Sequence, residues 1–254
     1  MYWKQIYLDI KEYCNSCEIC LRAKRNSSFR ITPLHPPPIP LAPFQQWQID
    51  HKNITRKIKL GNVAILCIVD SFSTWPILVP VPNMSAVTTA KVLFKEVIST
   101  YDVPSSILSD SGSAFCARFF TALMKVMNTK HRISAVGVAR TNGLAENLVK
   151  KFSQLAKIHS DDDTEIEQAI PLMVMSLRAI AHTKMQLSSF EVVLGRKMNV
   201  GDPNFKENLP DFNEGSDYFN WLTHRLAEIH RAVRENKIEG KEEHKRGYDK
   251  HNKV

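Results

Sequence analysis

The sequence predicts an α/β fold in which helices flank a mixed β-sheet. Three observations support this prediction. A chain of 254 residues, 43% of them hydrophobic, is long enough to bury one sizeable core. Short apolar segments with β-branched residues alternate with longer segments of helical periodicity. Three strand-like segments come first, and helices and strands then alternate, which is typical of a layered α/β architecture.

The N-terminal part is predicted to be a helix followed by a linker. In residues 1–25, apolar side chains recur at helical spacing and lead into a cysteine-rich segment. Residues 26–45 differ in composition, because the segment TPLHPPPIPLAP contains six prolines. Proline excludes a regular helix and favours an extended linker. We therefore place a domain boundary in residues 26–45.

A core at residues 46–200 and a C-terminal region at residues 201–254 are expected to follow. Strands are expected at residues 47–54, 62–72, 76–81, 106–110 and 131–136. Helices are expected from Asn83 or Ser85 to about residue 100, and at residues 114–127, 144–157, 163–182 and 188–195. The apolar face of the second is expected to hold Phe115, Phe119, Leu123 and Val126. Residues 199–215 predict a loop, and residues 216–250 a long charged helix with an apolar stripe from Tyr218 to Val233. This stripe could pack on the core or on another copy, and the last part could be solvated.

Composition and cysteine content narrow the class of protein. A net charge of +8 favours a polyanionic partner, although a merely basic soluble protein is an alternative. Five cysteines, an odd number, and the lack of a secretory signal argue against a secreted disulfide scaffold. The apolar segments are shorter than the roughly 20 residues that span a bilayer, so we expect no membrane partner.

Three acidic residues lie where an α/β sheet presents functional groups. Asp50 lies at the end of the first predicted strand, Asp110 ends a later strand before Ser111-Gly112, and Glu146 lies in the first turn of the helix opened by TNG. Together they would form an oxygen-rich site that suits Mg²⁺ or Mn²⁺. Their mutual repulsion would make this site seek a metal ion. Taken singly, each acid could instead form a turn or stabilise the positive end of a helix dipole.

The order and spacing of these residues resemble those of retroviral and LTR-retrotransposon integrases, especially the gypsy type. Glu146 follows Asp110 with 35 residues between them, which is similar to the D,D-35-E spacing of that family. The segments that resemble the family are, in chain order across residues 45–197, WQID, ILCIVDSFSTWPILVP, PSSILSDSGSAF, TNGLAEN and SSFEVVLGRK. One loop departs from the family, because VGVAR stands at residues 136–140 in place of a Tyr-His-Pro-Gln-like run.

The resemblance implies an RNase H-like fold with a five-stranded mixed sheet. It implies that Asp50, Asp110 and Glu146 bind two Mg²⁺ or Mn²⁺ ions, and that Asp70 is a strand-end residue rather than a ligand. The implied activity is DNA 3′-end processing and strand transfer, by in-line attack of water and then of a DNA 3′-hydroxyl on a phosphodiester. The expected partners are element ends and target DNA, with a homo-oligomer acting in the nucleus. A decayed or domesticated nucleic-acid-binding protein and an RNase H-type nuclease are the alternatives.

Side chains near Glu146 are candidate DNA contacts. Asn142 lies four residues before Glu146 and Lys150 four residues after it, so on a helix the three share a face. Lys150 could meet a phosphate near the metal ions or could pair with Glu146. Lys151 or Lys157 could follow the DNA backbone.

Cys17 and Cys20 resemble the second half of the integrase His-His-Cys-Cys domain, so residues 1–25 are expected to be a partial zinc-binding domain. Zinc needs four ligands, and the family's histidine pair would precede Tyr2-Trp3. We therefore expect an incomplete site, with two reduced, inert thiols as the alternative. In the family, the C-terminal helix leads to a small DNA-binding β-barrel. Because no such strands follow here, we expect a fragment of a longer polyprotein product.

Overall fold

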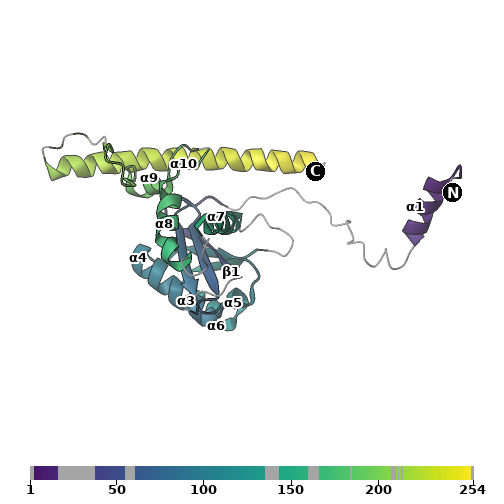
Figure 1. Ribbon diagram of the computed structural model, residues 1–254. Helices are drawn as coiled ribbons and strands as arrows, with labels where there is room; N and C mark the ends of the chain where they lie inside the picture. The colour runs from purple at the N-terminus through teal and green to yellow at the C-terminus, as the bar shows by residue number, and fades with distance from the viewer. Residues whose placement is uncertain are drawn as a thin grey trace. The chain divides into compact units, whose positions relative to one another are not determined.

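The computed structural model describes residues 3–16, 38–54, 61–134, 143–159, 166–183, 185–206, 210, 212 and 214–252 (Figure 1). The chain forms two compact units, one spanning residues 37–241 and the other combining residues 1–36 with residues 242–254. Helix α1 (Ile6–Ser16) belongs to the smaller unit and lies within the expected N-terminal helix. Cys17 and Cys20 fall outside the described residues, so the expected zinc half-site stays a prediction.

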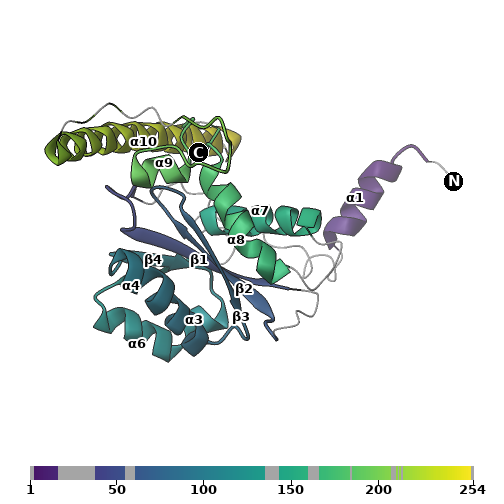
Figure 2. The same ribbon diagram turned by 60° about the vertical axis from the view of Figure 1, so that its left-hand side comes forward.

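The larger unit is built on a five-stranded sheet with the strand order β3-β2-β1-β4-β5 (Figure 2). The strands are β1 (Gln46–Asn53), β2 (Ala64–Asp70), β3 (Pro76–Val81), β4 (Ser106–Ser109) and β5 (Lys130–Ile133). The first three strands form an antiparallel meander, and β4 and β5 run parallel to β1. This mixed sheet confirms the predicted α/β class.

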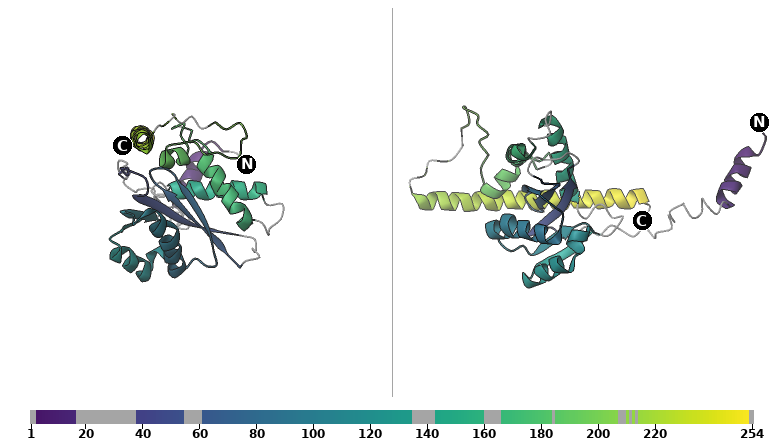
Figure 3. Two further views of the ribbon diagram at one scale, coloured as in Figure 1. Left: turned by 90° about the vertical axis from the view of Figure 1, so that its left-hand side faces the viewer. Right: turned by 60° about the horizontal axis from the view of Figure 1, so that its bottom comes forward.

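Helices cover both faces of the sheet (Figure 2, Figure 3). On one side lie α3 (Ala86–Val92), the π-helical η1 (Leu93–Ile98), α4 (Ser99–Tyr101), α5 (Ser113–Cys116) and α6 (Arg118–Val126). On the other side lie α7 (Gly143–His159) and α8 (Ile166–Ala179). Short α9 (Ser189–Leu194) and long α10 (Gly215–Asn252) complete the order. In the part of the chain that the structure describes, no helix combines the length and apolar character needed to cross a membrane.

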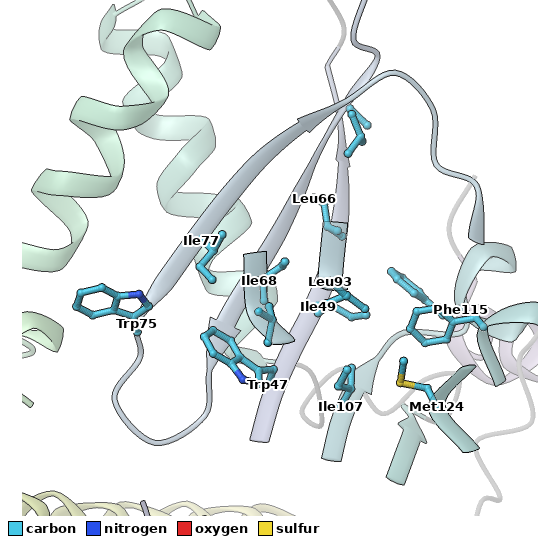
Figure 4. Close-up of a cluster of buried hydrophobic side chains, with 14 residues drawn as sticks. Trp47, Ile49, Leu66, Ile68, Trp75, Ile77, Leu93, Ile107, Phe115 and Met124 are labelled. Atoms are coloured by element: carbon cyan, nitrogen blue, oxygen red, sulfur yellow. The ribbon is translucent and has the colours of Figure 1, made fainter. Parts of the chain in front are cut away.

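Strand β2 explains how the two helical layers share one sheet. All seven of its residues are buried, as its continuous apolar sequence predicts for a central strand. Leu66 and Ile68 join a core that includes η1, α5 and α6 (Figure 4). Ile65, Cys67 and Val69 alternate with them and pack with α7 and α8 on the opposite face. Each residue of β1 can therefore be assigned to a face through its partner on β2.

One predicted helix is wrong in detail. Residues 114–127 form two helices, α5 and α6, separated at Ala117, whose backbone is extended (ψ 141°). The break brings both Phe115 and Phe120 into the core, where their ring centroids lie 5.9 Å apart. The apolar face predicted for one continuous helix is consequently shifted, and Phe119 and Val126 are 52% and 85% exposed.

The part of helix α10 that belongs to the larger unit packs on the core of that unit through part of the predicted stripe. Ile229 and Val233 are buried with Phe72 and Val192. His230 adds a 2.9 Å contact from Nε2 to the Val192 carbonyl oxygen and an edge-to-face contact with Phe72. The C-terminal end of the stripe thus packs on the core, which is one of the two alternatives that the sequence left open.

Candidate active site

The register of the parallel strands brings Asp50 and Asp110 together. The sequence suggested that Asp50 lies at the end of β1. The structure places it inside the strand, because β2 pairs with β1 as far as Asn53. Strand β4 pairs with β1 only as far as Gln48 opposite Leu108. Continuing this register by two residues places Asp110, the first residue after β4, beside Asp50. Both carboxyl groups therefore lie where β4 ends and β1 continues alone.

Glu146 reaches the same face of the sheet on helix α7. Asp50 pairs with Cys67, which faces α7, so Asp50 points to the α7 side. Helix α7 packs there through Ala145 and Leu148, which are almost fully buried on either side of Glu146 in sequence. Glu146 is half-buried in the first turn of the helix. The three acids thus gather on one face rather than on opposite faces.

The electrostatics of Asp50 reflect this grouping. Burial, followed by the negative charge of Asp110, raises the pKa of Asp50 from its ordinary value of 3.8 to about 6. Glu146 raises this pKa further, and a hydrogen bond from the backbone of His51 opposes the rise. Three carboxyl groups that repel one another form a donor set that suits a hard divalent cation. Within the described residues, no three His, Cys, Asp or Glu side chains already form a group that could hold a metal ion.

This raised pKa makes the stability of the metal-free protein depend on pH. Because folding favours the protonated carboxyl, its stabilising contribution is complete below the unfolded pKa of about 3.8 and is lost as pH rises through about 6. We expect a loss of about 1–2 kcal/mol, less than the full shift implies, because solvent screens the partly exposed group. Urea unfolding in chelator should show this loss in the wild type and not in Asp50→Asn. An identical pH dependence in the two proteins would contradict it.

The turn after β4 holds the Asp110 carboxylate. Its Oδ1 accepts a hydrogen bond of 3.0 Å from the backbone N–H of Gly112. A Cβ added to Gly112 would lie 2.9 Å from this oxygen, closer than real Cβ contacts come, and 3.3 Å from Cδ2 of Phe115, which is a tight contact. A side chain here would have to displace the Asp110 carboxylate or press on Phe115, which gives a physical reason for glycine in the SDSG segment.

Replacing Gly112 with alanine is expected to overpack this turn. The added methyl group presses on Asp110 and on the buried ring of Phe115, so the unfolding free energy should fall by about 1–3 kcal/mol. Chemical unfolding measures this loss. Gly240→Ala is the matched control, because its added Cβ meets open space within helix α10. Equal stability of the two variants would show that the turn at Gly112 is not tightly packed.

Part of the chain matches a known protein family. Residues 40–139 match the family model of the integrase core domain. This part of the chain is similar to the integrase core domain. The matched region includes Asp50 and Asp110, and Glu146 lies seven residues beyond its end.

Two relatives align with most of this chain. The sequence is 27% identical over 220 residues to the Gag-Pol polyprotein of walleye dermal sarcoma virus, which covers 85% of this chain and 12% of the polyprotein. It is 24% identical over 250 residues to the retrovirus-related Pol polyprotein from transposon 412 of Drosophila melanogaster, covering 98% of this chain and 20% of that protein. The chain thus spans a fifth or less of the length of these relatives.

A chain of a solved structure shares the fold of this protein. It is a chain from the cryo-EM structure of the simian T-cell lymphotropic virus intasome in complex with PP2A regulatory subunit B56 gamma. The TM-score is 0.54 at 16% identity, and the match covers 82% of this chain and 72% of the other. This likeness, with the mixed five-stranded sheet, confirms the predicted RNase H-like architecture.

The basic candidate residues lie on two faces of α7. Lys150 and Lys157 are exposed and share the face of Glu146 by helical periodicity. Lys151 lies on another face and lines a cavity of about 360 Å³ with residues of α8 and the start of β3. Among the described residues, no ion pair joins Lys150 to Glu146. Asn142 lies outside the described residues, so its predicted role is open.

Asp70 has a different environment from the three acids. It is fully buried, and its carboxylate accepts hydrogen bonds from the backbone N–H groups of Phe44, Phe72 and Ser73 and from the Ser73 hydroxyl. Four donors around one carboxylate stabilise the turn after β2. This environment fits the expectation that Asp70 is a strand-end residue.

Sequence reasoning missed Gln48, a buried polar residue of β1 near this site. Its side-chain Oε1 accepts a hydrogen bond of 3.1 Å from the backbone N–H of Leu144 in α7. The available signal was a glutamine inside an apolar strand, two residues before Asp50, because a buried amide needs hydrogen-bond partners.

Proposed function

We propose that this chain acts in DNA integration as a retroelement integrase, through metal-dependent DNA 3′-end processing and strand transfer. The observation that carries the proposal is the grouping of Asp50, Asp110 and Glu146 on one face of an integrase core sheet. In-line attack of water, and then of a DNA 3′-hydroxyl, on phosphodiesters needs positioning and charge stabilisation rather than a covalent enzyme intermediate.

The three carboxylates would hold the divalent cations, and Mg²⁺ or Mn²⁺ matches their oxygen donors. Bound cations supply Lewis-acid stabilisation of the charge that develops on the phosphoryl oxygens. Asp50 must be ionised to take part, and its pKa of about 6 means that it loses its proton just below neutral pH. The bond from Gly112 holds Asp110, and the packing of α7 holds Glu146.

DNA is the proposed partner. The net charge of +8 favours a polyanion, and Lys150 and Lys157 lie exposed on the α7 face that carries Glu146. A homo-oligomer on element ends, acting in the nucleus, is part of the proposal because the structural neighbour belongs to an intasome. Zinc at Cys17 and Cys20 is proposed only as an incomplete site.

A joining assay tests the proposal. The purified protein is incubated with labelled short duplexes that carry candidate element ends, in Mg²⁺, in Mn²⁺ and in chelator. We expect metal-dependent products longer than the substrate, formed when a 3′-end joins a second duplex. Cleavage without joining would favour an RNase H-type nuclease. DNA binding without metal-dependent cleavage or joining would overturn the proposal in favour of a decayed or domesticated binding protein.

A further inference from the structure

Gln48 links two elements that carry acids of the site. Its side chain is buried in β1, where Oε1 accepts the 3.1 Å hydrogen bond from the Leu144 N–H and Nε2 donates to the Ser71 hydroxyl at 3.4 Å. The first bond crosses from β1 to α7, and the second reaches the turn after β2. One neutral amide of β1 therefore bonds to two other parts of the fold, α7 and the turn after β2.

The bond to Leu144 satisfies a group that the helix itself leaves open. Leu144 is the second residue of α7, and the N–H groups of a first helical turn have no acceptor within the helix. Ser, Thr, Asp or Asn at the cap usually supplies that acceptor from the local chain. Here the acceptor comes from a strand 96 residues away in sequence. The start of α7 is thus fixed to β1 directly.

The position of this bond relates it to the acids. Glu146 lies two residues after Leu144 in the same helical turn, and Asp50 lies two residues after Gln48 on the same face of β1. A bond between Gln48 and Leu144 therefore constrains where the Glu146 backbone stands relative to Asp50. A neutral amide provides the acceptor without adding a fourth negative charge beside three carboxyl groups.

We infer that Gln48 is a positioning residue, which fixes the first turn of α7 so that Glu146 stands at the site of Asp50 and Asp110. Its effect on catalysis rests on the proposed function, whereas its structural role does not. The inference makes two separate claims. The first is that the Gln48 amide protects the Leu144 N–H from hydrogen exchange. The second is that the same bond positions Glu146 and thereby sets the rate of strand joining.

Hydrogen exchange of the Leu144 amide in the metal-free protein tests the first claim. Gln48→Met keeps a similar side-chain volume and removes the acceptor, so exchange should become roughly three- to tenfold faster. Gln48→Glu keeps the acceptor and should restore wild-type protection to within about twofold. Gln46→Met is the matched control, because Gln46 is a buried glutamine on the same face of β1 with no described side-chain bond to α7.

Unchanged Leu144 exchange in Gln48→Met, or an equal change in Gln46→Met, would overturn the inference. Should Gln48→Met not fold, Gln48→Asn tests the same contact, because its amide is one methylene too short to reach Leu144. Wild-type protection of the Leu144 amide in Gln48→Asn would also overturn the inference.

The second claim is tested in the joining assay at varied Mn²⁺. We expect Gln48→Met to lower the maximal joining rate by at least about tenfold, with the Kd for DNA unchanged, because misplaced acids impair the reacting geometry rather than DNA binding. Gln46→Met should join DNA at the wild-type rate. Faster Leu144 exchange with an unchanged joining rate would refute the positioning role. An inactive wild type would refute the proposed function instead, and the exchange comparison would still decide the structural claim.

Discussion

Replacing Asp110 with asparagine is expected to reduce metal-dependent strand joining by at least about a thousandfold while the protein stays folded. Removing one ligand charge costs several kcal/mol of transition-state stabilisation, and each 1.4 kcal/mol corresponds to about tenfold in rate. The fold should survive because Asp110 is exposed and an asparagine oxygen can still accept the bond from Gly112. Joining rates and circular dichroism measure the two effects.

Asp102→Asn is the matched control for this substitution. Asp102 is also exposed, and its carboxylate also accepts a bond from a nearby backbone N–H, that of Val103. It lies in the turn before β4, whereas Asp110 directly follows that strand. The control should join DNA at the wild-type rate. An Asp110→Asn protein that is folded and as active as this control would exclude Asp110 from the site.

Replacing Asp70 with alanine is expected to lower the unfolding free energy by about 3–5 kcal/mol. The substitution leaves the N–H groups of Phe44, Phe72 and Ser73 without their buried acceptor. It also removes the opposite charge from Lys237 of α10, a lysine whose pKa is lowered by burial and raised by Asp70. Urea or thermal unfolding measures the loss.

Asp70→Asn separates the two contributions to this loss. Its amide keeps one acceptor oxygen and removes the charge, so it should lose less stability than Asp70→Ala. A loss below about 1 kcal/mol in Asp70→Ala would show that the buried carboxylate is not holding this turn. The two aspartates are thus expected to differ in kind, Asp110 affecting joining and Asp70 affecting folding.

The strands and the acids could be predicted because their signals are local. The continuous apolar run of β2 indicates a strand buried on both faces, and the structure confirms it. Asp110 follows a short apolar strand, and Glu146 lies in a first helical turn. Local sequence places each residue on its element, and the resemblance supplied the expectation that the elements meet.

What could not be predicted depends on contacts between distant segments. The break at Ala117 lets Phe115 and Phe120 enter one core, and no local periodicity indicates that choice. The pairing of β1 with β2 as far as Asn53, but with β4 only as far as Gln48, depends on three separate strands. The hydrogen bond between Leu144 of α7 and Gln48 joins residues 96 positions apart. The sequence indicates a buried glutamine in a strand, but it does not indicate which group that glutamine bonds.

A crystal structure in saturating Mn²⁺, with anomalous diffraction to locate manganese, tests the metal site most directly. We expect manganese bonded to carboxylate oxygens of Asp50 and Asp110, with Glu146 at the same site. Asp110→Asn crystals should show weaker or no manganese there. A wild-type structure at saturating Mn²⁺ in which none of the three carboxylates contacts manganese would contradict the proposed active site.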